Sequence, residues 1–361
     1  MITISVPLPD RAYDVRIGRF SSAVEVADAL AAGLGDVSGL AVLVDGTVGE
    51  RSPRVAPLLA ALEAHFPRTR RYDLPGGEAC KNLREIERTV EWLAAQGFDR
   101  GAAVVGVGGG AAGDHSGFAA AVYLRGVRFA LVPTTLLAMV DASVGGKTAV
   151  DLGAGKNLVG AFHQPRAVVA DLGFLETLPR RERVAGLAEV VKAGLIANAA
   201  LFDQLEARGD SLASGGIDDG LVEAIAAAVR VKAEVVTEDE RESGRRAILN
   251  FGHTVGHALE AASGYELLHG EAVSLGMVAA LSLGVSLGLT PTPLRDRARA
   301  VLDRVGLPTD VERRLTPEIL ARVDVDKKRR SDAVRFVFVS APGVASLVDL
   351  PLAELRARLL P

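Results

Sequence analysis

The sequence predicts two domains: an N-terminal α/β domain with a Rossmann-like parallel sheet, and a C-terminal domain that is mostly α-helical. Up to about residue 170, short β-branched apolar runs alternate with Ala- and Leu-rich helical patterns, which is typical of a parallel sheet covered on both faces. From about Pro179 onward, long amphipathic stretches dominate. The 361 residues are enough for two domains, and we expect them at 1–177 and 178–361.

Each expected element rests on one run of residues. Apolar runs at 41–45, 102–107, 128–133 and 167–171 predict buried strands, whose carboxyl ends are where such sheets bind ligands. Helical patterns in the first domain lie at 55–65 and 83–96. In the second domain we expect helices at 182–205, 217–240, 252–263, 272–287 and 293–305, and a strand at 334–339.

Composition excludes several classes of protein. Hydrophobic residues make up 49% and charged residues 24%, the net charge is −4, and no long run of like charge suggests a nucleic-acid partner. The single cysteine, Cys80, excludes an intrachain disulfide and fits a reducing compartment. Residues 1–18 alternate like a strand and lack the pattern of a signal peptide. The uncharged run 272–294 is rich in Gly and Ser, so we expect a buried helix there, no membrane partner and a cytoplasmic protein.

The stretch from Glu242 to His257 concentrates candidate functional residues. His253 and His257 are four residues apart and share one helix face, and His269 follows closely, although the chain has only six histidines. Such a pair can also be ordinary surface or core histidines. With Arg246 and Asn250 just upstream, we favour a catalytic divalent metal, Zn²⁺, bound by His253 and His269 and by a carboxylate elsewhere.

Two glycine-rich segments suit anionic ligands. In Val104–Asp114 a strand runs into Gly108–Gly110 and then into a helical pattern, as backbone phosphate binding needs; a plain glycine-rich turn is the alternative, because Ala111 breaks the dinucleotide pattern GxGxxG. Residues 133–157 combine glycines, lysines, hydroxyls, Asp141 and Asn157. This density of donors suits an anionic, polyhydroxylated ligand, and a solvated loop is the alternative.

A carboxylate for the metal is available in the segment 187–192. Glu189 and Lys192 lie three residues apart among apolar neighbours, so they form either an ordinary ion pair or a metal ligand beside a substrate-binding cation. Lys232 also lies on an apolar helical pattern, where a lysine usually extends its amine to solvent. The charge cluster 326–328 is of a kind that is more often solvated than functional.

Together these segments resemble the 3-dehydroquinate synthases, which belong to the sugar phosphate cyclases, over nearly the whole chain. The motifs occur in the family's order. They are PGGExxK at 75–81, GGGxxGD at 108–114, YLRGV at 123–127, PTTLLAMVDASVGGK at 133–147, GKNLVGAFHQP at 155–165, AEVVKAGLI at 188–196, ESGRRAILNFGHTVGHALE at 242–260 and LHGEAV at 268–273.

The resemblance implies a dehydroquinate synthase-like fold, NAD and Zn²⁺ (or Co²⁺) as cofactors, and a homodimer in which Arg125 reaches the neighbouring subunit's site. It implies Glu189, His253 and His269 as metal ligands, and Lys192, His257, Asn250 and Asp141 as catalytic residues. The implied substrate-binding residues are Arg125, Lys147, Asn157, Lys232, Arg246 and one of Lys327 and Lys328. The implied NAD-binding residues are Asp45, Glu78, Lys81, Gly109, Gly110, Asp114, Thr134, Thr135, Lys156 and Thr177.

The implied reaction is the cyclisation of 3-deoxy-D-arabino-heptulosonate 7-phosphate to 3-dehydroquinate in the shikimate pathway: transient oxidation by NAD, β-elimination of phosphate, reduction and an intramolecular aldol step. Arg246 favours a substrate with a carboxylate. The alternatives are an aminodehydroquinate synthase or sedoheptulose 7-phosphate cyclase of secondary metabolism, and a glycerol dehydrogenase-like enzyme. Departures from the family pattern at 151–154, at His115 and after Lys328 leave room for a specialised paralogue.

Overall fold

The computed structural model describes residues 1–264, 266–327 and 333–359 and contains two compact units, Met1–Pro179 and Arg180–Pro361. The first is an α/β unit and the second is mostly helical, so the predicted fold class is confirmed. The assignment of NAD binding to the first unit and of metal and substrate binding to the second stays a prediction.

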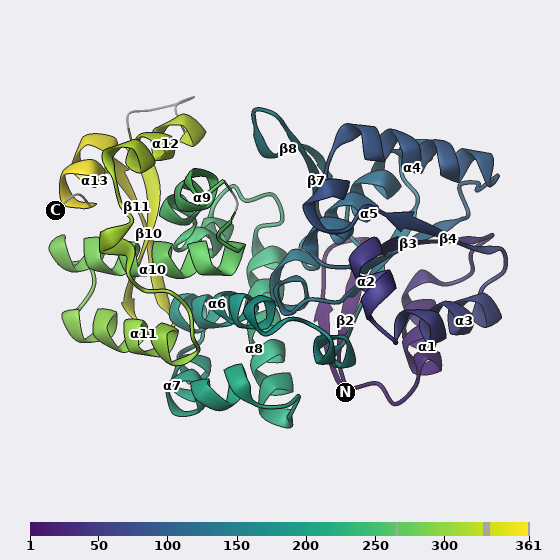
Figure 1. Ribbon diagram of the computed structural model, residues 1–361, viewed down its shortest axis with the longest axis horizontal. Coiled ribbons are helices and arrows are strands. Elements are labelled where there is room, and N and C mark those ends of the chain that lie inside the picture. Colours follow the sequence, from purple (N-terminus) through teal and green to yellow (C-terminus); the bar gives the residue numbers. More distant parts are fainter. Residues whose placement is uncertain (265, 328–332, 360–361) are drawn as a thin grey trace. The chain divides into compact units, whose positions relative to one another are not determined.

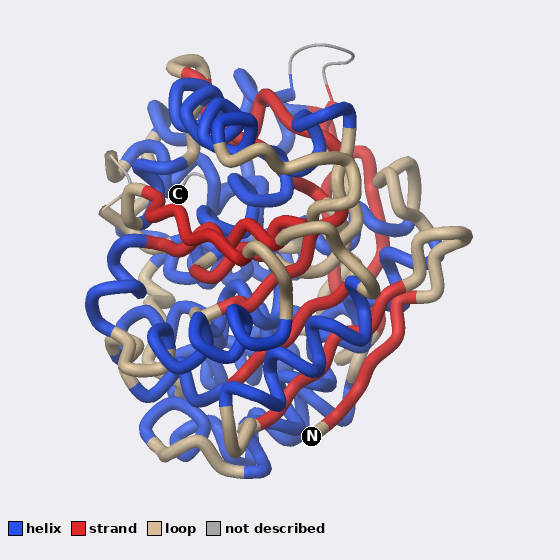
Figure 2. Tube along the Cα trace, turned by 90° about the vertical axis from the view of Figure 1, so that its right-hand side faces the viewer, coloured by secondary structure: helices blue, strands red, loops and turns tan. Residues whose placement is uncertain are grey.

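A seven-stranded sheet forms the centre of the first unit (Figure 1). All neighbouring strands are parallel except the first pair, in which residues 2–6 run antiparallel to residues 13–17. The sheet is therefore mixed but mostly parallel, and its antiparallel edge strand begins near the N-terminus (Figure 2). The spatial order is β1 (Ile2–Val6), β2 (Tyr13–Gly18), β9 (Ala167–Asp171), β6 (Arg128–Pro133), β5 (Ala103–Gly108), β3 (Leu40–Asp45) and β4 (Thr69–Leu74).

Helices cover both faces of this sheet, as a parallel sheet requires. On one face α1 (Ala23–Leu34) packs beside α3 (Val55–His65), and on the other α4 (Leu83–Ala95) packs beside α5 (Gly110–Val122) (Figure 1). The side chains of Ser22 and Asn82 cap α1 and α4. The short elements are α2 (Gly46–Arg51), η1 (Gly77–Cys80), η2 (Tyr123–Arg125) and η4 (Leu172–Glu176).

The segment after β6 is more ordered than a glycine-rich loop. It forms a π-helical turn, η3 (Ala138–Ala142), and then an antiparallel hairpin of β7 (Lys147–Leu152) and β8 (Gly155–Phe162). The Asp151 amide donates to the Lys81 carbonyl at 2.9 Å, so the hairpin is joined to the turn after η1. Apolar side chains alternating on the α5 side, such as Val150, explain why the segment pairs as strands.

Helices dominate the second unit, with one hairpin of β10 (Ala333–Ala341) and β11 (Val344–Pro351). The expected helix at 182–205 is interrupted at Asn198, whose side chain accepts from the Leu201 amide at 3.0 Å and starts a new helix. The helices are α6 (Arg180–Ala197), α7 (Ala199–Ser214), α8 (Asp219–Glu238), α9 (His253–Ala262), α10 (His269–Ser286), α11 (Thr292–Arg304), α12 (Pro317–Lys327) and α13 (Leu352–Leu359), with the 3₁₀ turns η5 (Arg245–Asn250) and η6 (Val311–Arg313).

Helix α10 is buried almost throughout and packs against both α9 and α6. Its glycines allow very close contact: a Cβ on Gly276 would lie 1.8 Å from the Gly252 carbonyl oxygen, and one on Gly270 would lie 1.8 Å from that of Ala185. The expected buried helix after His269 is thus present. Among the described residues, no helix combines the length and apolar character that crossing a membrane would need.

We expect Gly276→Ala to destabilise the second unit by about 1–3 kcal/mol or more, because the added methyl group meets backbone and forces α9 away from α10. Thermal unfolding measures the effect. Gly216→Ala is the matched control, since a Cβ there meets nothing within 4 Å. Equal melting temperatures for the two variants would contradict the close packing.

Candidate functional site

Asp45 joins two turns at the carboxyl end of the sheet in the first unit. Its carboxylate accepts hydrogen bonds from the Val48 amide at 3.2 Å and from the Gly77 amide at 3.0 Å. The second bond fixes the turn that carries Glu78 and Lys81. Three of the predicted NAD-binding residues are therefore held in one segment of structure.

The buried Lys81 connects this turn to α5 and to the β7–β8 hairpin. The Lys81 amine lies 2.7 Å from the Asp114 carboxylate and 2.6 Å from the Asn157 side-chain oxygen. The Asn157 amide in turn donates to Asp151 at 2.7 Å, with Asn157 in the left-handed region at φ 56°. Asn157, predicted to bind substrate, is thus placed beside two residues predicted to bind NAD.

His115, a departure from the family pattern, supports the same turn from within the core. It is fully buried, and its Nδ1–H donates to the Cys80 carbonyl at 2.8 Å. Because that nitrogen donates, Nε2 accepts from the Thr89 hydroxyl at 2.8 Å. Burial lowers the pKa of His115, so the neutral imidazole holds the backbone next to Lys81.

The glycine-rich turn lies where β5 meets α5. Gly109 is the N-cap of α5 and Gly110 its first residue, so unpaired backbone amides and the positive end of the helix dipole lie at this point. Thr134, after the neighbouring strand β6, is buried and its hydroxyl has no hydrogen-bond partner, whereas Thr135 caps the next turn through the Ala138 amide at 3.1 Å. A buried hydroxyl without a partner is what a bound polar ligand would satisfy, and these residues fit a dinucleotide.

The other residues predicted in the first unit have these positions. Glu78 and Lys156 are 3.9 Å apart, Thr177 follows η4, Asp141 lies in η3 and Lys147 begins β7. Arg125 ends η2, where Leu124 and Arg125 both have positive φ angles of 48° and 68°.

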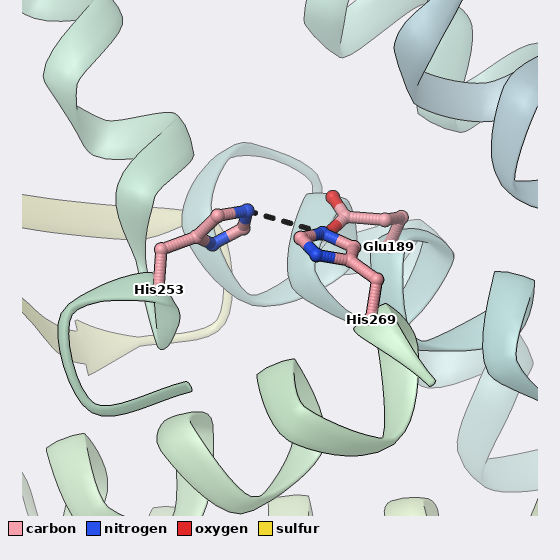
Figure 3. A group of neighbouring side chains, drawn as sticks. All are labelled: Glu189, His253 and His269. Atoms are coloured by element: carbon pink, nitrogen blue, oxygen red, sulfur yellow. Dashed lines mark ion pairs between the residues drawn. The ribbon is translucent and has the colours of Figure 1, made fainter. Parts of the chain in front are cut away.

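Three helices of the second unit bring Glu189, His253 and His269 together (Figure 3). Glu189 lies in the middle of α6, and the two histidines begin α9 and α10. The Nε2 atoms of both histidines lie 3.7 Å from the same carboxylate oxygen, Oε1 of Glu189. This is the predicted metal-ligand set.

The geometry of this cluster fits a cation. Zinc binds nitrogen and oxygen ligands at about 2.0–2.2 Å, so an ion can lie between atoms 3.7 Å apart. Glu189 is buried, its Oε1 has no hydrogen-bond partner, and its Oε2 pairs with the buried Lys192 amine. Although burial lowers the pKa of His269, the neighbouring Glu189 and Glu260 carboxylates raise that pKa to about 9, so the surroundings of the ring favour positive charge.

The loop that carries Arg246, also in the second unit, is held by the Asp239 side chain. The Asp239 carboxylate accepts from the backbone amides of Ser243 at 2.9 Å, Gly244 at 2.7 Å and Arg246 at 3.0 Å. Although burial opposes it, this set of donors lowers the pKa of Asp239 to about 2. The Arg246 side chain is buried and one of its nitrogens donates to the Glu240 carbonyl.

The remaining predicted residues of the second unit lie on η5, α8, α9 and α12. The Asn250 amide donates to Glu242 at 2.5 Å, and the His257 ring is 5.2 Å from that of His253. Lys232 is buried on α8. The side chain of Lys327 and the whole of Lys328 lie outside the described residues, so their predicted role is untested.

Comparison with known proteins agrees with the geometry. Family models for the 3-dehydroquinate synthase N-terminal and C-terminal regions match residues 71–185 and 186–329. A 3-dehydroquinate synthase of Rhodospirillum rubrum is 48% identical over 373 residues, which covers 99% of this chain and 95% of that protein. The chain belongs to the 3-dehydroquinate synthase family. Members of the 3-dehydroquinate synthase family are phosphate-eliminating lyases of the shikimate pathway, and that activity is this chain's.

Solved structures of other sugar phosphate cyclases share the fold. A 2-epi-5-epi-valiolone synthase of Streptomyces hygroscopicus with NAD⁺ and Zn²⁺ bound has a TM-score of 0.86 at 30% identity, covering 98% of this chain and 97% of that one. A 2-deoxy-scyllo-inosose synthase with carbaglucose-6-phosphate, NAD⁺ and Co²⁺ has a TM-score of 0.86 at 26% identity, covering 99% of both chains.

Two acidic residues that contact predicted site residues were missed from the sequence. Asp239 holds the Arg246 loop, and the buried Glu260 lies 3.5 Å from His269. Each is an acidic residue at or beside the Glu242–His257 stretch, but an acid on a helix is usually solvated. Only its burial and its partners distinguish it.

We expect Glu189→Gln to lose bound Zn²⁺ and to lower stability by about 3–5 kcal/mol, because Lys192 is left buried without the carboxylate. Bound zinc after dialysis and thermal unfolding measure the two effects. The double variant Glu189→Leu/Lys192→Met should recover most of the stability without recovering zinc. Glu223→Gln, an exposed change on α8, is the control. Zinc retained by the Gln variant would exclude Glu189 as a ligand.

Proposed function

We propose that the chain cyclises 3-deoxy-D-arabino-heptulosonate 7-phosphate to 3-dehydroquinate with loss of phosphate, using NAD and a divalent metal, Zn²⁺ or Co²⁺. The observation that carries this proposal is the Glu189–His253–His269 cluster, in which a buried carboxylate oxygen faces two imidazole nitrogens and accepts no hydrogen bond. Three protein ligands suit a catalytic rather than a structural zinc, because they leave positions for substrate hydroxyls.

The bound cofactors would supply transient oxidation and re-reduction of one carbon and Lewis acidity at adjacent hydroxyls. The chain's own residues bind and orient the substrate. Lys192, held by Glu189 in a buried ion pair, offers a fixed cation for an anionic substrate. His257, one turn after His253, and Asn250 are assigned to the phosphate, which itself removes a proton as it leaves. Asp141 is assigned a catalytic role on the resemblance.

The NAD site is proposed at the carboxyl end of the sheet in the first unit. The α5 N-terminus supports a pyrophosphate there, and the buried Thr134 hydroxyl supports a polar ligand beside it. The Lys81–Asp114 pair and Asp45 hold the surrounding turns. Glu78, Lys156, Thr135 and Thr177 complete the proposed set by resemblance.

Arg246 supports a substrate that carries a carboxylate. Its guanidinium is a planar fork suited to bidentate carboxylate binding, and Asp239 fixes the loop that presents it. Lys147 and Lys232 are proposed to add positive charge. Cyclases that act on sedoheptulose 7-phosphate or glucose 6-phosphate have no carboxylate to recognise, so the heptulosonate is the favoured substrate.

A phosphate-release assay on the heptulosonate phosphate with NAD⁺ and Zn²⁺ tests this function. We expect phosphate release without net absorbance change at 340 nm, since NAD is regenerated, and little release from sedoheptulose 7-phosphate. Arg246→Lys should raise KM for the heptulosonate about 10–100-fold, because a hydrogen bond to a charged group contributes about 1.5–3 kcal/mol. Arg245→Lys, an exposed neighbour, is the control. Release from sedoheptulose 7-phosphate alone, or accumulating NADH, would overturn the proposal.

We also propose a homodimer formed through an apolar surface of the first unit. We assign to this surface four of the exposed large apolar side chains of the unit, Val122, Leu124, Leu158 and Phe162; Leu158 is 56% exposed, and Arg125 follows Leu124 in the chain. The two consecutive positive φ angles are strained for non-glycine residues, as is common at functional positions.

Light scattering after gel filtration should give a dimer for the parent chain and a monomer for Leu158→Arg, because a buried charge without a partner is costly. Leu289→Arg changes an exposed leucine of the second unit and should leave the dimer intact. A Leu158→Arg dimer would show that another surface is used.

A further inference from the structure

His269 lies between two carboxylates. Its Nε2 is 3.7 Å from Glu189 and its Nδ1 is 3.5 Å from Glu260. It also belongs to a second group that could hold a metal, formed with His257 and Glu260. A neutral imidazole has one N–H and one lone pair, so the two nitrogens cannot both bind a metal.

The neighbouring histidine shows which nitrogen faces the metal. His253 Nδ1–H donates to the Phe251 carbonyl at 3.2 Å, which leaves the Nε2 lone pair directed to Glu189. His269, on a different helix, presents the same nitrogen to the same Glu189 oxygen. The Glu189 group is thus the metal position, and Glu260 faces the opposite nitrogen of His269.

We propose that Glu260 is a positioning residue that accepts the Nδ1–H of His269 and thereby directs its Nε2 at the metal. Glu260 is only 6% exposed and lies on α9 two turns after His253, so one helix carries a ligand and the partner of another ligand. Such outer carboxylates fix the tautomer of a ligand histidine and strengthen its bond to the metal.

Helix α10 holds His269 in place for this contact. The Glu271 side chain accepts from the Leu268 amide at 3.0 Å, and Arg181 of α6 donates to both Glu271 oxygens at 2.6 Å. The backbone at His269 is therefore fixed from two sides. These contacts fix the backbone but not the rotation of the imidazole ring. The Glu260 carboxylate restricts that rotation.

The test is Zn²⁺ affinity of the metal-free full chain, measured by competition with a chromogenic chelator. We expect Glu260→Ala to weaken binding about 10–100-fold. Glu260→Gln should stay within a few-fold of the parent, since the amide oxygen accepts the same N–H. Glu234→Ala, an exposed residue of α8, should bind like the parent.

A cycle with His269→Ala separates this role from a general loss of structure. If Glu260 acts through His269, then Glu260→Ala adds no further loss of affinity in the His269→Ala background. Thermal unfolding of each metal-free variant checks that it is folded. If Glu260→Ala does not fold, the Zn²⁺ affinity of Glu260→Gln is measured in its place. Parent-like affinity of Glu260→Ala, or a loss in Glu260→Gln equal to that in the Ala variant, would overturn the proposal. The proposal rests on the proposed metal site, and failure of that site would appear separately as a parent chain that binds no Zn²⁺.

Discussion

The second unit depends on one buried carboxylate, that of Glu189. A carboxylate in the middle of a buried helix is costly unless it is paired, and Lys192 pairs with only one of its oxygens. The other oxygen faces the Nε2 atoms of two histidines. This carboxylate oxygen, which accepts no hydrogen bond, therefore lies where we propose that a divalent cation binds.

That carboxylate can meet both histidines only because three helices approach closely. Gly270 and Gly276 on α10 touch backbone of α6 and of the segment before α9, where any larger residue would collide. Both histidines sit at the first residue of their helices, so the close contacts set the positions of their backbones. The contacts that pack α10 thus also set the positions of two proposed metal ligands.

Secondary structure was predicted best from the sequence where a single local pattern of residues determines the element. Strands β3, β5, β6 and β9 were predicted almost to the residue because continuous apolar runs mark buried parallel strands. The break at Asn198 was missed because helical patterns continue on both sides of it. The β7–β8 hairpin was missed because its glycines and charged residues resemble a loop. The ordered motifs brought Glu189, His253 and His269 to attention although they are far apart in the chain.

Residues that act through partners could not be found in this way. Asp239 and Glu260 are acidic residues on or next to helices, and nothing local separates them from solvated acids. Asp239 is distinguished by three backbone amides that converge on it, and Glu260 by its burial against His269. Both sets of contacts form only when separate segments pack together. For a site of this kind, sequence motifs indicate which residues are candidate ligands. The residues that orient those ligands are identified only by the hydrogen bonds of the folded chain.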